Sequence, residues 1–252
     1  MSKSFVFAAA ALVAALCASP AAAQDPAAEG EGVAILGTGL DVAAEVNLLS
    51  DYRFRGVSRS DEDPALQGAL TITHASGFYV GTRATTLSGL DSLRLSDPRF
   101  EDLGDVEADL YAGYTMDLGG GLDLDAGLLY YLFVGGEGET DYFEPYASLS
   151  YLLGPVYATA GAKYAPSQDA IGNEDMLYLF GQVDASIPLT PVRFTAQAGR
   201  QDWGRFGSYW NWSVGGSYAI GPADLGVRYV DTDLPSVGGQ DAGLVFSLGL
   251  RF

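Results

Sequence analysis

The chain has 252 residues, with 13 Lys or Arg against 32 Asp or Glu and a formal net charge of −19. Such an acidic protein is repelled by a phosphate backbone, which argues against nucleic acid as a partner. The charge does not exclude a membrane, because charged side chains can lie in loops and inside a barrel.

Residues 1–23 have the pattern of a secretory signal peptide. Lys3 provides the basic start, residues 5–16 form an uninterrupted apolar run, and residues 21–23 are the small residues of a cleavage site. The apolar run is too short to cross a bilayer as a helix. We therefore expect a secreted mature chain that begins at Gln24.

The residues on either side of this cleavage site predict neither a lipid anchor nor a folded element. Cys17 raises the alternative of a lipoprotein, but the bulky Leu16 before it does not fit a lipidation signal. Loss of Cys17 with the signal excludes disulfides and thiol catalysis. Residues 24–40 are Ala, Gly and acidic residues without a hydrophobic period, and we expect a flexible acidic periplasmic tail.

From residue 41 onward, hydrophobic residues recur with the period of two that is typical of strands. In the last stretch, Leu244, Phe246 and Leu248 alternate with Val245 and Ser247. Most of the predicted strands have the roughly nine to eleven residues of a membrane-crossing strand. They are 41–53, 66–74, 78–86, 105–117, 122–134, 142–153, 156–165, 175–187, 192–201, 209–220, 224–232 and 241–252.

The predicted connections alternate between tight Gly- or Pro-containing turns and longer polar loops. This alternation is typical of a membrane barrel with short periplasmic turns and longer external loops. The turns are at 75–77, 119–121, 154–155, 190–191 and 221–222, and the loops are 54–65, 87–104, 135–141, 166–174, 202–208 and 233–240.

The alternative is a soluble β-sandwich or a lipocalin-like barrel, which bury the apolar face instead. Three features favour the membrane: a second face rich in Gly, Ser, Thr and charges, aromatic residues near strand ends, and the terminal Phe252. We predict an all-β protein over residues 41–252, a single transmembrane antiparallel up-and-down β-barrel of about twelve strands in the outer membrane. Its expected partners are outer-membrane lipid, lipopolysaccharide and the barrel-assembly machinery, which would contact the C-terminal strand.

A motif follows the first strand. Residues 50–58 are Ser-Asp-Tyr-Arg-Phe-Arg-Gly-Val-Ser, residues 64–68 are Pro-Ala-Leu-Gln-Gly, and residues 74–81 are His-Ala-Ser-Gly-Phe-Tyr-Val-Gly. This pattern resembles the opening of the TorF-like porin family, also called the Gcw_chp family, and the resemblance extends loosely to the C-terminus. It implies an outer-membrane barrel of poorly known function, and it supplies no catalytic residues.

The same motif alternates charges at the corner between a strand and a loop: Arg53, Arg55 and Arg59 are interleaved with Asp51 and with the acidic residues 61–63. Two interpretations remain open. The charges could pair and fold the first external loop over the mouth. They could equally form a solvated loop in which ion pairs contribute little.

The charges on the lumen face are expected to separate into two walls when the sheet closes. A basic wall would come from strands three, nine, eleven and twelve, and an acidic wall from strands four, five, six and eight. Glu45, Asp51 and Lys163 are exceptions. An alternative is that these charges pair and plug a bore of intermediate width. The basic wall is Arg83, Arg193, Arg228 and Arg251, and the acidic wall is Glu107, Asp109, Asp125, Glu144 and Asp184.

Catalysis has little support in the sequence. The only histidine, His74, has no Ser–His–acid spacing around it and no second histidine for a metal site. Residues 61–63 lack the spacing of a calcium loop. We therefore predict no enzyme activity, no metal and no cofactor. The expected function is a narrow porin-like channel for passive diffusion of small polar or charged solutes, and the alternative is a plugged structural or surface-interaction barrel.

Overall fold

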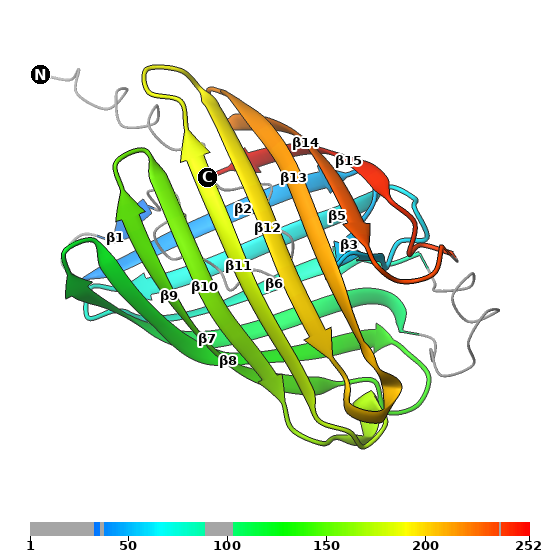
Figure 1. Cartoon of the computed structure of the whole chain (residues 1–252). Coiled ribbons are helices and arrows are strands. Elements are labelled where there is room, and N and C mark those ends of the chain that lie inside the picture. The colour runs from blue at the N-terminus through cyan, green and yellow to red at the C-terminus, as the bar shows by residue number, and fades with distance from the viewer. Residues whose placement is uncertain (1–32, 36–37, 89–102, 237) are drawn as a thin grey trace, which may run out of the picture.

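The computed structural model describes residues 33–35, 38–88, 103–236 and 238–252. They form one antiparallel sheet of thirteen strands that closes on itself, because β2 pairs with both β15 and β5 (Figure 1). The short β1 only extends the edge of β2, which leaves twelve strands to form the barrel wall. The predicted all-β fold and strand number are confirmed.

The barrel strands follow one another around the wall in chain order, each paired antiparallel with the next. They are β2 (Leu40–Leu49), β5 (Ala65–His74), β6 (Phe78–Thr86), β7 (Gly104–Gly119), β8 (Leu122–Gly135), β9 (Tyr142–Leu153), β10 (Val156–Ala165), β11 (Met176–Ser186), β12 (Val192–Asp202), β13 (Ser208–Ile220), β14 (Ala223–Thr232) and β15 (Gly243–Arg251).

The first predicted strand is too long at its C-terminal end. β2 ends at Leu49, not at residue 53, and the chain turns inward to form the two-stranded hairpin of β3 (Arg53–Phe54) and β4 (Val57–Ser58). The reason is local, because the amide of Tyr52 donates to the hydroxyl of Ser60 at 2.8 Å and not to a sheet partner. Residues 50–64 are called the inward loop below.

The N-terminal part of the described chain contains one further strand. β1 (Val33–Ile35) pairs with residues 40–42 of β2, beside the stretch of β2 that pairs with β15. β1 falls within the segment expected to be a flexible tail. The predicted signal peptide lies outside the described residues and stays a prediction.

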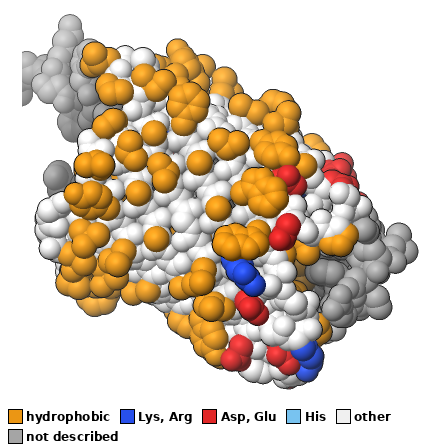
Figure 2. All heavy atoms as spheres, viewed as in Figure 1, with side chains coloured by type: hydrophobic (Ala, Val, Ile, Leu, Met, Phe, Trp, Pro, Cys, Tyr) orange, Lys and Arg blue, Asp and Glu red, His pale blue; other side chains and the backbone are white. Residues whose placement is uncertain are grey.

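The outer face of the wall is apolar. Leu128, Val214 and Leu248 expose 46%, 56% and 42% of their surface, as do many other large hydrophobic residues of the strands. Figure 2 shows hydrophobic side chains spread over the strands, with charged side chains gathered at the end where the longer loops lie. In water this surface would be unfavourable, and in lipid it is the expected band of a transmembrane barrel. The predicted outer-membrane barrel is confirmed.

The inner face is polar and aromatic, which inverts the arrangement of a soluble barrel. Tyrosines of β6, β7, β8, β9 and β11 point inward among Thr, Ser, Gln and charged residues. Glycines make room for them: a Cβ on Gly113 would collide with the ring of Tyr79, and one on Gly199 with that of Tyr178. The core of this protein is therefore its lumen.

The longer connections carry two short 3₁₀ helices, η1 (Asp169–Ile171) and η2 (Gly204–Phe206). Within the described ranges, no helix is long and apolar enough to cross a membrane.

Candidate functional site: the charged lumen and its inward loop

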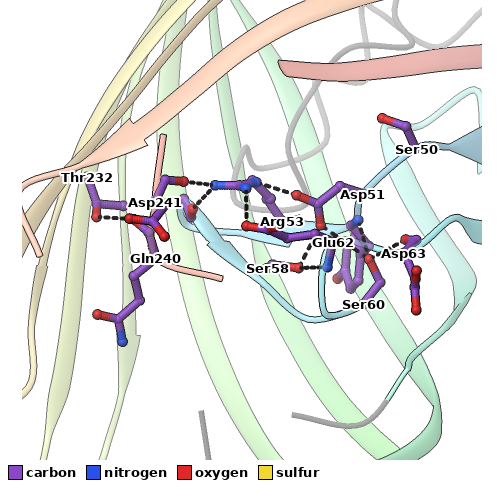
Figure 3. Close-up of polar contacts among 12 residues, drawn as sticks. Ser50, Asp51, Arg53, Ser58, Ser60, Glu62, Asp63, Thr232, Gln240 and Asp241 are labelled. Carbon is purple, nitrogen blue, oxygen red and sulfur yellow. Dashed lines mark hydrogen bonds and ion pairs between the residues drawn. The ribbon is translucent and has the colours of Figure 1, made fainter. Parts of the chain in front are cut away.

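The inward loop enters the lumen and is held at its base by a network around one carboxylate. Arg53 Nε donates to Asp51 Oδ2 at 2.5 Å, and Ser58 Oγ donates to Asp51 Oδ1 at 2.6 Å. Arg53 also donates to the carbonyl of Asp241 at 2.5 Å, and the amide of Ser58 donates to the carbonyl of Gly239 at 2.8 Å (Figure 3). These contacts join the inward loop to the connection between β14 and β15, and Figure 3 shows the one between Arg53 and Asp241.

The tip of the inward loop is pressed against β13 and β14 of the wall. Arg55 and Gly56 make the turn between β3 and β4 with φ of 49° and 90°, a region that favours glycine. A Cβ on Gly56 would collide with Thr232 of β14 and lie 3.0 Å from Cβ of Asn211 of β13. Only glycine fits this position without displacing the loop.

Arg55 is the centre of the contact between the loop and the acidic wall. Its Nη2 donates to both carboxylate oxygens of Glu144, at 2.8 and 2.6 Å, and its Nη1 donates to the side-chain carbonyl of Gln201. The guanidinium lies 4.4 Å from the ring centroid of Tyr178, and Tyr131 donates to Glu144 at 2.9 Å. The side chains of Arg55 and Glu144 are 1% and 0% exposed, so this ion pair is out of water.

Arg59 makes a similar contact with β7, two strands from Glu144 on β9. It forms an ion pair with Glu107 at 2.5 Å, and the hydroxyl of Tyr52 donates to the other oxygen of Glu107 at 2.9 Å. The guanidinium of Arg59 lies 3.6 Å from the ring centroid of Phe54 and 5.5 Å from that of Phe133. Two guanidinium groups of one loop therefore neutralise two wall carboxylates.

The guanidinium groups of Arg55 and Arg59 stay charged over any ordinary pH. Burial alone would lower the pKa of the Arg55 guanidinium, but Glu144, Tyr131 and Tyr142 together more than offset burial and the pKa is raised. The same balance, with Glu107 as the carboxylate, raises the pKa of Arg59. Burial and Glu107 raise the pKa of the Tyr52 phenol, which therefore stays a neutral hydrogen-bond donor.

Residues 35–244 match the sequence profile of a family described as "Bacterial protein of unknown function (Gcw_chp)". The chain belongs to the Gcw_chp family. The resemblance noted in the motif at residues 50–58 is thereby confirmed, and in this member the motif forms the inward loop. No curated protein matches the chain.

Many solved structures share the fold of this Gcw_chp chain. A structure titled "KdgM porin" has a TM-score of 0.53 at 9% identity and covers 83% of this chain and 98% of its own. A structure of the NanC porin has a TM-score of 0.55 at 11% identity, covering 84% and 98%. At such identities the similarity shows the fold alone, which is that of a porin barrel.

The predicted basic wall is only partly distinct from the acidic wall. Arg83 lies on β6 directly opposite Asp109 of β7, and Arg83 Nε is 3.4 Å from Asp109. Arg83 thus joins the acidic cluster and does not face it across the bore. Lys163 of β10, noted as an exception in the sequence, is also almost fully buried.

The other predicted lumen residues point inward but lie away from the inward loop. Asp125 accepts a hydrogen bond from Tyr79 at 2.7 Å, and Asp184 accepts one from Thr195 at 2.5 Å. Arg193 is the second residue of β12, just after a short turn. Two further basic residues complete this part of the lumen: Arg228, buried in β14, and Arg251, the last residue of β15, whose Nε is 3.8 Å from Glu45.

Sequence reasoning missed the polar and aromatic partners that complete the site. Tyr131, Tyr178 and Gln201 surround the Arg55–Glu144 pair, and Tyr79 and Tyr146 contact each other through their hydroxyls. A signal was present, since each of these residues lies at an inward position of the period-two pattern. A buried tyrosine hydroxyl needs a hydrogen-bond partner, which lipid does not offer. Tyrosines at inward positions could therefore have been assigned to the lumen from the sequence.

Proposed function

We propose that this chain is an outer-membrane, porin-like channel for small polar or charged solutes, and that the inward loop forms its constriction. The observation that carries the proposal is a lumen lined with charged and hydrogen-bonding side chains inside a closed barrel with an apolar exterior. Buried ion pairs are weak evidence for a stabilising role, since well-packed apolar residues often serve as well. A polar lining is thus better explained by a role in contacting solutes than by stability alone.

The porin titles of the structurally similar proteins support the proposal only at the level of the fold. A solute on the proposed path passes the inward loop near one end of the lumen. Near the other end, where the short turns lie, it passes charges that are less enclosed. The proposed role is passive transport without chemistry, with lipid and lipopolysaccharide around the barrel.

One observation favours a second candidate, a barrel that is permanently plugged. The inward loop contacts wall residues from β7 to β14, and its Tyr52, Arg55 and Ser60 are 1% exposed or less. At that level the side chains of the loop are packed against the wall. A plugged barrel would serve as a structural or surface-interaction protein.

Conductance in planar bilayers separates the two candidates. The wild-type protein is compared with a variant in which residues 52–60 are replaced by a Gly-Ser linker of equal length, and with a control that replaces residues 136–140 of another long loop. A channel gives ion steps in the wild type and larger steps in the inward-loop variant alone. Steps absent from all three proteins, with heat-modifiable folded barrel in each, would contradict the channel.

We also propose that the barrel-assembly machinery recognises the C-terminal strand. Phe252 is largely exposed, while its backbone makes two hydrogen bonds with Ala44 of β2, at 2.9 and 3.2 Å. Deletion of Phe252 should reduce the amount of folded barrel in the outer membrane, and Phe252→Tyr should not. Equal amounts of all three proteins would contradict this recognition.

A further inference from the structure

The contact between Arg55 and the wall has the composition of a binding site for a cation. We propose that Glu144, Tyr131, Tyr178 and Gln201 form a recognition site for a guanidinium-bearing solute, and that Arg55 of the inward loop occupies it as an internal ligand. The proposal names the solute class of the channel and rests on the proposed function for the route by which a solute arrives. The binding site itself can be tested without conduction.

The site belongs to the wall and not to the loop. Glu144 lies on β9, Tyr131 on β8, Tyr178 on β11 and Gln201 on β12, all in the hydrogen-bonded sheet. Tyr178 and Gln201 are direct cross-strand partners, and the ring of Tyr131 stacks on that of Tyr142 at 4.6 Å. The same four groups would therefore stay in place if the inward loop moved out.

The chemistry of the four groups suits a guanidinium better than an ammonium. One terminal nitrogen of Arg55 donates to both oxygens of Glu144, the other donates to Gln201, and the plane lies over Tyr178. A planar cation can make side-on hydrogen bonds and face-on ring contact at the same time, whereas an ammonium is a compact point charge. A free carboxylate, an amide oxygen and an aromatic face would thus select the planar group.

Two features indicate that the site holds the head group of Arg55 and not its stem. Nε of Arg55 is buried and has no hydrogen-bond partner, so only the terminal nitrogens are recognised. The backbone of Arg55 adopts a φ of 49°, a left-handed conformation that is uncommon for residues other than glycine. The inward loop therefore takes an unfavourable turn to deliver a guanidinium, and a solute without that constraint can compete with it.

Competition of this kind would couple binding to opening. A guanidinium-bearing solute that replaces Arg55 neutralises Glu144 in the same way, so the wall carboxylate is never left buried without a partner. The contacts of Arg59 and Tyr52 with Glu107 would then still attach the loop to the acidic wall. Guanidinium-bearing solutes would therefore open the constriction by binding to the wall site that Arg55 leaves.

The test is chemical rescue of Arg55→Ala in the full-length, detergent-solubilised barrel. Ethylguanidinium at millimolar concentration should raise the unfolding temperature of this variant in a saturable way, with ethylammonium binding about tenfold more weakly. Arg55→Ala/Glu144→Gln should show no saturable rise. Arg200→Ala, which removes an exposed arginine of β12, is the matched control and should not respond.

Three results would overturn the proposal. The first is an equal response of Arg55→Ala to both cations, which would mean that the site distinguishes charge only. The second is a saturable response that persists without Glu144. The third is the absence of any response in Arg55→Ala when its heat-modifiable barrel shows that it is folded. If Arg55→Ala does not fold, Arg55→Lys provides the same comparison, since ethylguanidinium should outcompete the lysine.

Conductance recorded on the same proteins keeps the two proposals apart. Saturable ethylguanidinium binding with no ion steps would leave the binding site in place and contradict the channel. Ion steps without selective binding would do the reverse.

Discussion

The half of the lumen beneath the inward loop and the half near the short turns satisfy their charges in different ways. Beneath the loop, Glu107 and Glu144 are fully buried, and guanidinium groups of the loop contact them at 2.5 and 2.6 Å. Near the short turns, Arg251 and Glu45 lie 3.8 Å apart, and the Glu45 side chain is 29% exposed. Wall charge beneath the inward loop is thus balanced by arginines of the loop, and charge near the turns by residues of the wall itself.

The largest expected effect is a difference in stability between the two halves. Glu144→Gln leaves Arg55 buried without a counter-charge, and breaking a buried pair in this way costs about 3–5 kcal/mol. Glu45→Gln breaks a longer, partly hydrated pair, for which a cost of about 0–1 kcal/mol is expected. The free energy of unfolding from lipid vesicles by urea measures both.

The double variant Arg55→Gln/Glu144→Gln is the control for this comparison. Removing both charges should recover most of the stability that Glu144→Gln alone loses, because Arg55 is then no longer a buried charge without its partner. Equal losses for Glu144→Gln and Glu45→Gln would show that the two halves of the lumen are equally hydrated, and the comparison would fail.

A smaller effect is expected from moving the inward loop without changing any charge. Gly56→Ala places a methyl group against Thr232, at a positive φ, and should displace the loop tip and raise single-channel conductance several-fold. Gly207→Ala is the matched control, because Gly207 also has a positive φ but a Cβ there meets nothing within 4 Å. A rise in both variants, or in neither, would mean that the loop does not limit conduction.

The difference between the halves also explains what the sequence could predict. The period of two found the twelve strands of the wall and their lipid-facing side, although it extended the first strand beyond Leu49. The same pattern does not tell at which height along the barrel axis a residue of one strand lies relative to a residue of the next strand. The pairing of Arg83 with Asp109 depends on the register between β6 and β7, so the sequence placed Arg83 in the wrong cluster.

The inward loop was harder still to predict. Its motif allowed either a folded or a solvated loop, because charged residues are satisfied by water as readily as by each other. The partners that hold Arg55 lie 89 residues away at Glu144 and 146 residues away at Gln201, and only closure of the barrel brings them together. The motif identified the family, and the tertiary fold identified what the motif contacts.

The smallest expected effect is on ion selectivity, and it should come from the half near the turns. Asp125 and Asp184 face the lumen outside the network of the inward loop, held by hydroxyl and amide donors and not by the loop's arginines. Asp125→Asn/Asp184→Asn should move the reversal potential toward anions, and Arg193→Gln/Arg228→Gln should move it toward cations. Both shifts should shrink in 1 M salt, where the screening length is about 3 Å.

The control is Glu107→Gln/Arg59→Gln, which changes no net charge beneath the loop and should leave the reversal potential unmoved. A shift in this control, with no shift in the two double variants near the turns, would mean that ions pass along the contacts of the inward loop. The half of the lumen beneath the loop would then set the ion selectivity, and the half near the turns would not.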